Sequence, residues 1–374
     1  MHRSSDVRLT RRGVLVGAAR LGLARVARAA APATSQAAFP RRQARPRPDL
    51  RAPGSDLEVI QITSDPEVPY SHIYMESHVF TPDSKRFVLQ RSGHPHGSDK
   101  NDPLHQFLLC DIEDGLRLAP LTDELGTCGP AVSPDGKYLY YFVDYTHRRQ
   151  SPCYIELRRV GLDGTGRETI ARIEGRIPGT EYHLSRLYPL STISSDGARI
   201  AISGFLGDGQ TERAPFGLVV FDVRTGAAHV AIAGPNLGNM HPQYCRSLDP
   251  EARHGVLIQE NHGQMANARG GLAIQDDDRN GADIHVIRDD GTNLRDLPWG
   301  RDGEEYCQGH QCWRGRSGWA ITSTAPRRNL DAHLIESLPV PHVGHIGLRT
   351  PGGIRNRISR SHNEPRFHHF ATDL

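Results

Sequence analysis

Histidine is frequent in this chain, with 20 copies among 374 residues. Gln308 stands two positions before His310, another histidine is His241, and His368 and His369 lie together near the C-terminus. Imidazole nitrogens with an amide oxygen suit a divalent first-row metal, Mn²⁺ above all, better than a metal that seeks thiolates. If the fold brings these five side chains to one axis, they predict a metal site. The alternative for each histidine is that its ring caps a strand or bonds a neighbouring backbone group.

A second group of side chains could bind and deprotonate an acidic substrate. The polar insertion 260–271 contains Glu260 and His262, and an imidazole with a pKa of about 6.5 can act as a general base. Arg186 and Arg246 could each hold a carboxylate through a two-pronged hydrogen bond. We therefore expect catalytic roles for His262, Arg246 and Arg186, and substrate contacts from Glu260, Gln243 and His78. The alternative is a solvated loop with surface arginines.

Repeated hairpins are the elements that must position these residues. Residues 130–142 predict a strand, a two-residue turn at Asp135-Gly136 with positive φ at both positions, and a second strand. Near or looser copies start at His78, Ser191, His241 and His310. The turn aspartates recur about every 50–60 residues, which is the period of propeller blades or solenoid units, at Asp83, Asp135, Asp196 and Asp249.

A further strand–turn–strand signal lies between successive hairpins, as in residues 217–226. Four strands per unit predict an all-β fold, a β-propeller of four-stranded blades. The predicted blades are 77–121, 128–172, 190–233, 241–297 and 308–349. A sixth begins near His368, so we expect six to seven blades with the last one incomplete, and a leading strand at 57–63 that completes the last blade. An all-β solenoid is the alternative, although its repeats are usually shorter.

The first 31 residues resemble a twin-arginine export signal, with Arg11-Arg12 before an apolar run and Ala29-Ala30-Ala31 at its end. Residues 32–56 are rich in Pro, Ala and Arg and indicate a disordered linker, which leaves 57–374 for the propeller. This organisation predicts a periplasmic or secreted protein; a cytoplasmic location stays open. The alternative for the N-terminus is a disordered basic extension. No stretch has the roughly 18 apolar residues of a membrane span.

Charge and cysteine content narrow the class of protein. The formal net charge of +2 argues against a nucleic-acid partner, and we expect a monomer. The six cysteines have no Cys-x-x-Cys spacing, so a zinc site is disfavoured, and export would allow one or two disulfides. No Gly-x-Ser-x-Gly motif, phosphate-binding loop or dinucleotide fingerprint occurs, so hydrolase, kinase and dehydrogenase readings have no support.

Short matches spread over residues 57–374 resemble oligogalacturonate lyases, a family of TolB-like propellers. They are Val59–Thr63, Tyr74–Asp83, His241-Pro242, Glu260–Gly263 and the His310–Trp313 run. The resemblance implies a metal held by histidines and a glutamine, with His310 as a ligand and His262 as the base. The implied substrate is an acidic oligosaccharide, such as an oligogalacturonide released from pectin.

The implied reaction is β-elimination. A metal and an arginine would stabilise the negative charge that develops as the C5 proton of a uronate leaves. The alternative function is a non-catalytic TolB-like propeller that binds a protein or glycan partner, and a different enzyme on the same ring is a third.

Overall fold

The computed structural model describes one part of the chain, with gaps. The described residues are 45–51, 53–54, 56, 58–63, 69–74, 76–91, 102–146, 154–274, 281–300, 305–329, 334–340 and 356–357. The chain divides into two units, 1–37 and 38–374, and all described residues belong to the second. The predicted export signal therefore lies outside the described residues.

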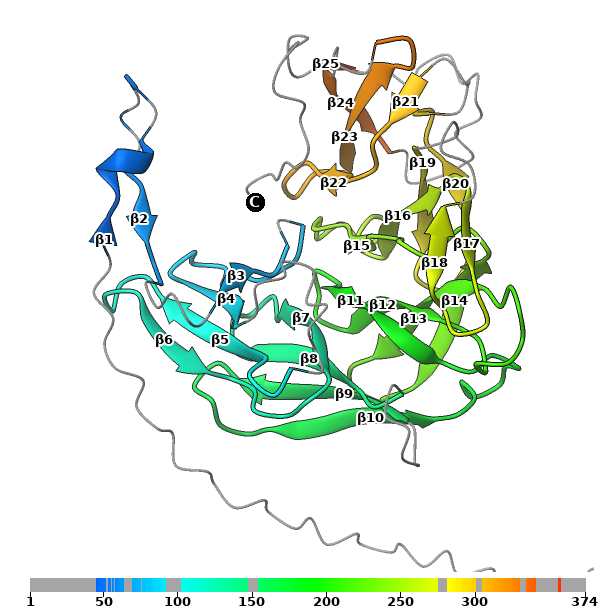
Figure 1. Cartoon of the computed structure of the whole chain (residues 1–374), viewed down its shortest axis with the longest axis horizontal. Coiled ribbons are helices and arrows are strands. Elements are labelled where there is room, and N and C mark those ends of the chain that lie inside the picture. Colours follow the sequence, from blue (N-terminus) through cyan, green and yellow to red (C-terminus); the bar gives the residue numbers. More distant parts are fainter. Residues whose placement is uncertain are drawn as a thin grey trace, which may run out of the picture. The chain divides into compact units, whose positions relative to one another are not determined.

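The second unit is built from antiparallel sheets that follow one another in chain order (Figure 1). Blade 1 has β3 (Ser71–His72), β4 (Arg86–Arg91), β5 (Gln106–Asp111) and β6 (Arg117–Pro120). Blade 2 has β7 (Thr127–Val132), β8 (Tyr138–Asp144), β9 (Tyr154–Gly161) and β10 (Glu168–Glu174). Blade 3 has β11 (Ser185–Ile193), β12 (Arg199–Phe205), β13 (Phe216–Asp222) and β14 (Ala228–Gly234).

Two later blades carry additions to this plan. Blade 4 has β15 (Gln243–Tyr244), β16 (Gly255–Asn261), β19 (Ala282–Arg288) and β20 (Arg295–Asp296), with the hairpin β17 (Gln264–Ala266) and β18 (Leu272–Ile274) inserted. Blade 5 has β21 (Glu305–Cys307), β22 (Cys312–Trp313), β23 (Trp319–Pro326), β24 (Leu334–Pro339) and β25 (Asn356–Arg357). The predicted all-β propeller of four-stranded blades is confirmed, with five blades among the described residues. The sixth, expected near His368, lies outside them.

The Asp-Gly hairpins differ in detail from the expected two-residue turn. In blade 2 the loop is longer: Ser133 N–H donates to the Tyr138 carbonyl (2.9 Å), and Gly136 N–H donates to the Ser133 carbonyl (2.8 Å). Only Gly136 has a positive φ, +68°. The Asp135 carboxylate instead accepts a bond from Ser133 Oγ (2.6 Å), so the aspartate fixes the loop through its side chain.

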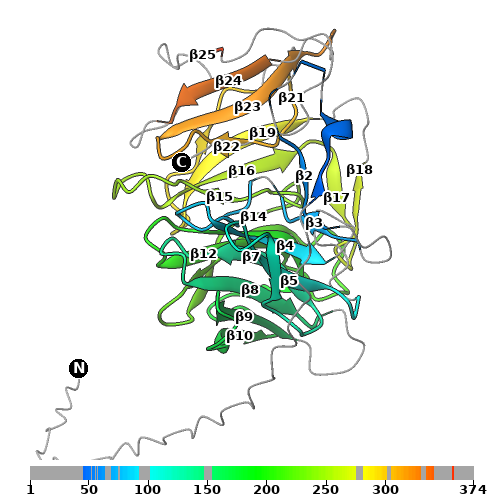
Figure 2. The same cartoon turned by 90° about the vertical axis from the view of Figure 1, so that its left-hand side faces the viewer.

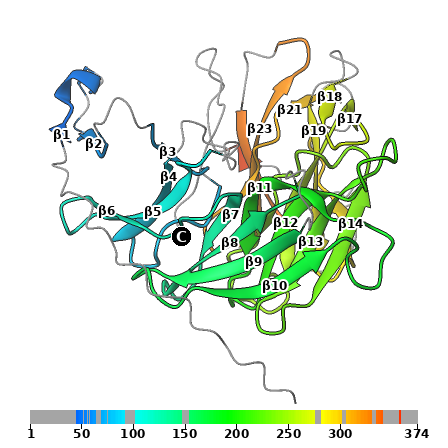
Figure 3. The same ribbon diagram turned by 60° about the horizontal axis from the view of Figure 1, so that its bottom comes forward.

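Apolar side chains of alternating direction join each blade to its two neighbours. On β8, Leu139, Tyr141 and Val143 pack towards blade 1, whereas Tyr140 and Phe142 pack towards blade 3. Figure 2 and Figure 3 show the sheets of blades 2 and 3 lying against each other. A strand that is buried on both faces is nearly all apolar, which is why the inner and middle strands read as continuous hydrophobic runs.

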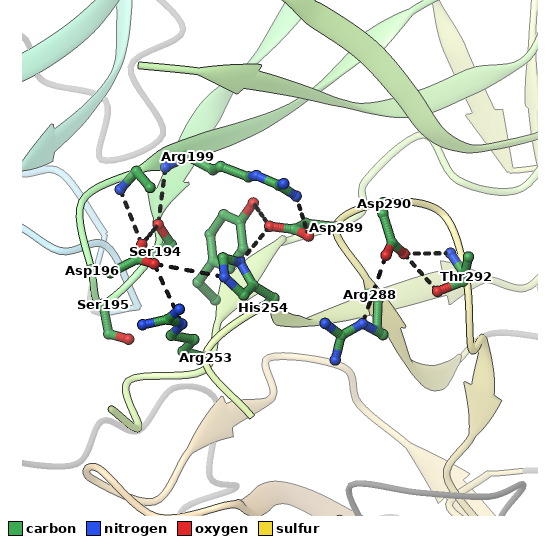
Figure 4. Close-up of polar contacts among 12 residues, drawn as sticks. Ser194, Ser195, Asp196, Arg199, Arg253, His254, Arg288, Asp289, Asp290 and Thr292 are labelled. Atoms are coloured by element: carbon green, nitrogen blue, oxygen red, sulfur yellow. Dashed lines mark hydrogen bonds and ion pairs between the residues drawn. The ribbon is translucent and has the colours of Figure 1, made fainter. Parts of the chain in front are cut away.

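A buried polar cluster also connects blades 3 and 4, and we call it the interblade clasp (Figure 4). Its centre is Asp289, whose side chain is only 1% exposed. Asp289 accepts hydrogen bonds from Arg199 (2.6 Å), Tyr244 (3.0 Å) and His254 (2.9 Å). Asp196, from the blade 3 hairpin, lies 3.6 Å from the other His254 nitrogen. Charged and uncharged donors thus compensate the buried carboxylate.

The leading strand pairs with a segment near the N-terminus, and the blade that it was expected to complete lies outside the described residues. In the described part of the chain, β2 (Ile60–Gln61) pairs with β1 (Arg45–Pro46), which lies within the stretch that we expected to be a linker. A short 3-10 helix, η1 (Pro48–Leu50), separates the two strands.

Four of the described cysteines form no disulfide. Cys110, Cys245, Cys307 and Cys312 are buried thiols, and Cys153 lies outside the described residues. Burial raises the pKa of each of these four thiols, to about 11 or 12, so they are neutral near pH 7. Within the described residues, no helix is long and apolar enough to span a membrane.

Candidate functional site

His241 and His310 occupy the same position in blades 4 and 5. Cys245 and Arg314 each close the first hairpin of their blade with a backbone hydrogen bond of 2.8 Å. Each histidine lies four residues before that closing residue. Equivalent positions of successive blades face the same interior, and the two rings do meet there, with centroids 5.3 Å apart in an edge-to-face arrangement.

Both histidines have a backbone conformation that is unfavourable for residues other than glycine. Their φ angles are +47° and +53°, and the equivalent residue of blade 2, Gly129, has +55°. A left-handed conformation costs a non-glycine residue about 1–3 kcal/mol and persists where the surrounding structure imposes it. The surroundings of these two residues therefore impose the conformation, and blades 4 and 5 place an imidazole where blade 2 has a glycine.

His241 lies between a carboxyl group and a phenol. Its Nδ1 is 3.3 Å from Glu76 Oε2 of blade 1, and its Nε2 is 3.4 Å from the Tyr188 hydroxyl of blade 3. Tyr74 lies against the same ring, with centroids 5.1 Å apart, and is 6.2 Å from the His310 ring. Glu76, Tyr74 and His241 are all buried. We call Tyr74, Glu76, Tyr188, His241 and His310 the channel cluster.

Burial dominates the proton affinities in the channel cluster. Desolvation raises the pKa of Glu76, and the hydrogen bond to His241 opposes that rise. The pKa of Tyr74 and of Tyr188 also lies above its ordinary value because of burial. An uncharged Tyr188 keeps its hydroxyl proton, so it can donate to Nε2 of His241 while Nδ1–H of the ring donates to Glu76.

Amide side chains fix the strand that carries His241. Gln311 Nε2 donates to the His241 carbonyl (3.1 Å), and Gln243 Nε2 donates to the Gln311 carbonyl. Trp313 Nε1 donates to the Gln243 carbonyl (2.9 Å). Gln243, predicted to contact substrate, is buried and instead connects blades 4 and 5.

His78 and Arg246 form a pair of their own. Arg246 Nε lies 3.2 Å from His78 Nε2. Burial, followed by the positive charge of Arg246, lowers the pKa of His78 to about 3. At neutral pH, His78 is therefore an uncharged acceptor for the guanidinium, and the positive charge of the pair stays on Arg246.

His262 and Glu260 lie at the end of β16, apart from the His241 contacts. His262 Nε2 is 3.2 Å from the Asp283 carboxylate, and the His262 side chain is 24% exposed. Glu260 accepts from Asn236 (3.1 Å) and lies 3.5 Å from His285. The insertion that we expected to be a polar loop contains the β17–β18 hairpin.

Hydrogen bonds lead from His310 to the residue before His262. The Gln259 side chain accepts from the His310 backbone N–H (3.3 Å) and donates to Asn261 Oδ1 (3.0 Å). His262 therefore directly follows the strand whose Gln259 supports His310.

The remaining candidates take other partners. Arg186 Nη1 donates to the Gly270 carbonyl (2.8 Å), so it holds the inserted hairpin of blade 4 against blade 3. Gln308 Oε1 accepts from Ser323 Oγ (2.9 Å) within blade 5. His368 and His369 lie outside the described residues.

The described residues do not fit a complete metal site. Among them, no group of three His, Cys, Asp or Glu side chains is placed to hold a metal ion. Both ring nitrogens of His241 already face protein partners, Glu76 and Tyr188. We therefore derive no chemical step through a metal.

Sequence reasoning missed Tyr74, Tyr188 and Gln311. Tyr74 and Tyr188 come shortly before the hairpins of their blades, so their position relative to the repeat was a usable signal. Gln311 directly follows His310, but its role in holding the His241 backbone depends on the neighbouring blade and has no signal in the sequence.

Comparisons with known proteins support the fold. No protein-family model matches the chain, and no curated protein matches it significantly. Among solved structures, an oligogalacturonate lyase in complex with manganese is 17% identical over 79% of this chain and 69% of that one, with a TM-score of 0.56. An oligogalacturonate lyase from Vibrio parahaemolyticus is 15% identical over 76% of this chain and 67% of that one, with a TM-score of 0.53. The chain thus has the β-propeller fold seen in oligogalacturonate lyases.

Proposed function

We propose that this propeller binds uronate-containing oligosaccharides at the channel cluster and cleaves them by β-elimination. The observation that carries the proposal is the meeting of the buried Glu76 and His241 with the half-buried His310, from three different blades, in one cluster. Titratable groups are costly to bury and contribute little to a propeller core that apolar side chains already fill. The similarity in fold to two oligogalacturonate lyases supports the substrate class.

His262 is the proposed base. A general base needs an accessible nitrogen and a partner that orients its ring. His262 meets both conditions, because it is partly exposed and Asp283 lies 3.2 Å from its Nε2. His241 is 1% exposed and has partners at both nitrogens, so it suits a positioning role.

Arg246 is the proposed partner of the substrate carboxylate. Its neighbour His78 is uncharged at neutral pH, so the pair offers a positive charge to an acidic sugar. Arg186 supports the site indirectly by holding the inserted hairpin. Glu260 lies close to His285, so we assign it a structural role and not a contact with the sugar.

The proposed reaction transfers two protons and shifts two electron pairs, and the hydroxide formed from the donating water finally recovers the proton from His262. His262 takes the C5 proton of the uronate, and the C5–H electrons form a C4–C5 double bond. The C4–O bond breaks, and the leaving oxygen takes a proton from water. Arg246 lies beside the start of β16 and His262 follows its end, so Arg246 would bind the carboxylate of another sugar unit of the oligosaccharide and not that of the reacting one. A divalent ion, Mn²⁺ by analogy with the manganese-bound lyase, would need ligands from outside the described residues.

Calorimetry with trigalacturonate tests the binding half of the proposal. We expect Arg246→Met to weaken binding at least tenfold, and His262→Gln to bind normally but turn over about 10²–10⁴-fold more slowly. A neutral trisaccharide should not bind. His229→Gln is the matched control, because His229 lies on the outer strand β14 and bonds the Asp289 carbonyl. Equal binding of the acidic and neutral sugars would contradict the assignment.

If trigalacturonate binds and no product forms with or without Mn²⁺, the protein is a binding propeller. That outcome would favour the non-catalytic alternative and remove the role of His262 as a base.

A further inference from the structure

A small cavity lies at the junction of blades 4 and 5, away from the channel cluster residues. The space in the cavity and its open mouth is about 290 Å³ in all, and only a small part of it is enclosed. Its lining includes Glu251, Arg288, Asn293, Arg295, Trp313 and Val340. Two of these six side chains are arginines, so the cavity has a positive character.

Arg295 is buried without a counter-ion among the described residues. It lies on β20, is 5% exposed, and its Nε and Nη1 atoms have no hydrogen-bond partner in the described part of the chain. Burial, and then the charge of Arg288, lower the pKa of Arg295. Unsatisfied buried donors on a charged group are costly.

Other cavity residues do not compensate this charge. Arg288 Nη1 donates to the Glu251 carbonyl (3.2 Å), and the carboxylate near Arg288 is Asp290, at 3.8 Å. Glu251 is exposed to solvent. Arg199 shows the contrast, because its guanidinium is paired with the buried Asp289 at 2.6 Å.

We propose that this cavity binds a small anion, which accepts hydrogen bonds from Arg295. A halide, a carboxylate group or phosphate would supply the missing acceptor and charge. The anion would contact residues of both blades, because Arg295 belongs to blade 4 and Trp313 to blade 5. It would therefore stabilise their junction, and the proposal does not depend on the function proposed above.

Thermal unfolding in matched salts tests the site. The thermal unfolding of wild-type protein is followed in sodium gluconate, a bulky reference anion, and in chloride, acetate or phosphate at the same ionic strength. Above its Kd, the bound anion should raise Tm by about 2 °C for each tenfold increase in concentration. Arg295→Met removes the buried charge, so its Tm should equal or exceed that of wild type in gluconate and should not respond to the small anion.

Arg253→Met is the matched control. Arg253 lies in the same blade, pairs with Asp196 at 3.4 Å and is absent from the cavity lining. This variant should keep the full response to the anion. Equal responses of wild type and Arg295→Met would overturn the proposal, as would the absence of any response in wild type.

Chlorine-35 line broadening on the wild-type protein is a second readout, independent of variant folding. Excess broadening that acetate or phosphate removes identifies one site shared by halide and oxyanions. A Tm response to acetate or phosphate without chloride broadening identifies an oxyanion site. If neither signal is observed, water alone fills the cavity and the proposal is wrong.

Discussion

The interblade clasp gives the sharpest prediction for stability. Asp289→Asn keeps the size of the side chain but removes its charge and one of its two acceptor oxygens. In the structure, one oxygen accepts from Arg199, and the other accepts from both Tyr244 and His254. Whichever way the new amide points, its NH₂ group must face at least one donor.

The expected loss of stability depends on which hydrogen bonds the asparagine can still accept. Hydrogen bonds to charged groups contribute about 1.5–3 kcal/mol each, and removal of one partner of a buried ion pair costs about 3–5 kcal/mol. Asparagine retains one acceptor, so we expect a loss of about 3 kcal/mol in the free energy of unfolding. Tyr244→Phe removes a single uncharged donor and should cost about 1 kcal/mol.

Urea unfolding, followed by tyrosine and tryptophan fluorescence, measures these losses. Asp290→Asn is the matched control, because Asp290 is the next residue and its side chain is 49% exposed. It should change the free energy of unfolding by less than about 0.5 kcal/mol. If Asp289→Asn and Asp290→Asn unfold at the same urea concentration, the clasp does not stabilise the junction and the reasoning is wrong.

Three further predictions concern the channel. The folded pKa of His78 is about 3, below its unfolded value, so wild type should lose stability as pH falls from about 6.5 towards 3. In His78→Gln, Tm should fall less steeply over this acidic range. The folded pKa of Glu76 is raised, so wild type should lose stability relative to Glu76→Gln as pH rises above about 4.5, and Tm at pH 4 and pH 8 checks the sign. Gly129→Ala should cost about 1–3 kcal/mol in urea unfolding, because φ is +55° and a Cβ would lie 2.8 Å from Ile202 Cδ1; an unchanged midpoint would contradict this.

The sequence predicted the propeller because each blade repeats the same local chemistry. An aspartate recurs in the first hairpin of four of the five blades, followed by glycine in blades 2 and 3, and this pattern needs no knowledge of distant contacts. The expected positive φ at Asp135 was wrong, because the loop is longer than two residues and the aspartate acts through its side chain.

The location of a site residue was predictable only where its position in the blade repeat determines it. His241 and His310 meet because equivalent positions of neighbouring blades share one interior. The partners of Gln243, Glu260 and Arg186 depend on adjacent blades or on the inserted hairpin, which repeat position does not encode.

The most direct test of the proposed function is the ultraviolet absorbance of wild-type protein mixed with oligogalacturonides and Mn²⁺. Elimination creates a C4–C5 double bond conjugated to the carboxylate, so the absorbance should rise steadily and reach a plateau set by the substrate. The rise should be slower by about 10²–10⁴-fold in His262→Gln, and a chelator added midway tests the metal. A flat trace under conditions where calorimetry shows bound trigalacturonate would contradict the proposed elimination.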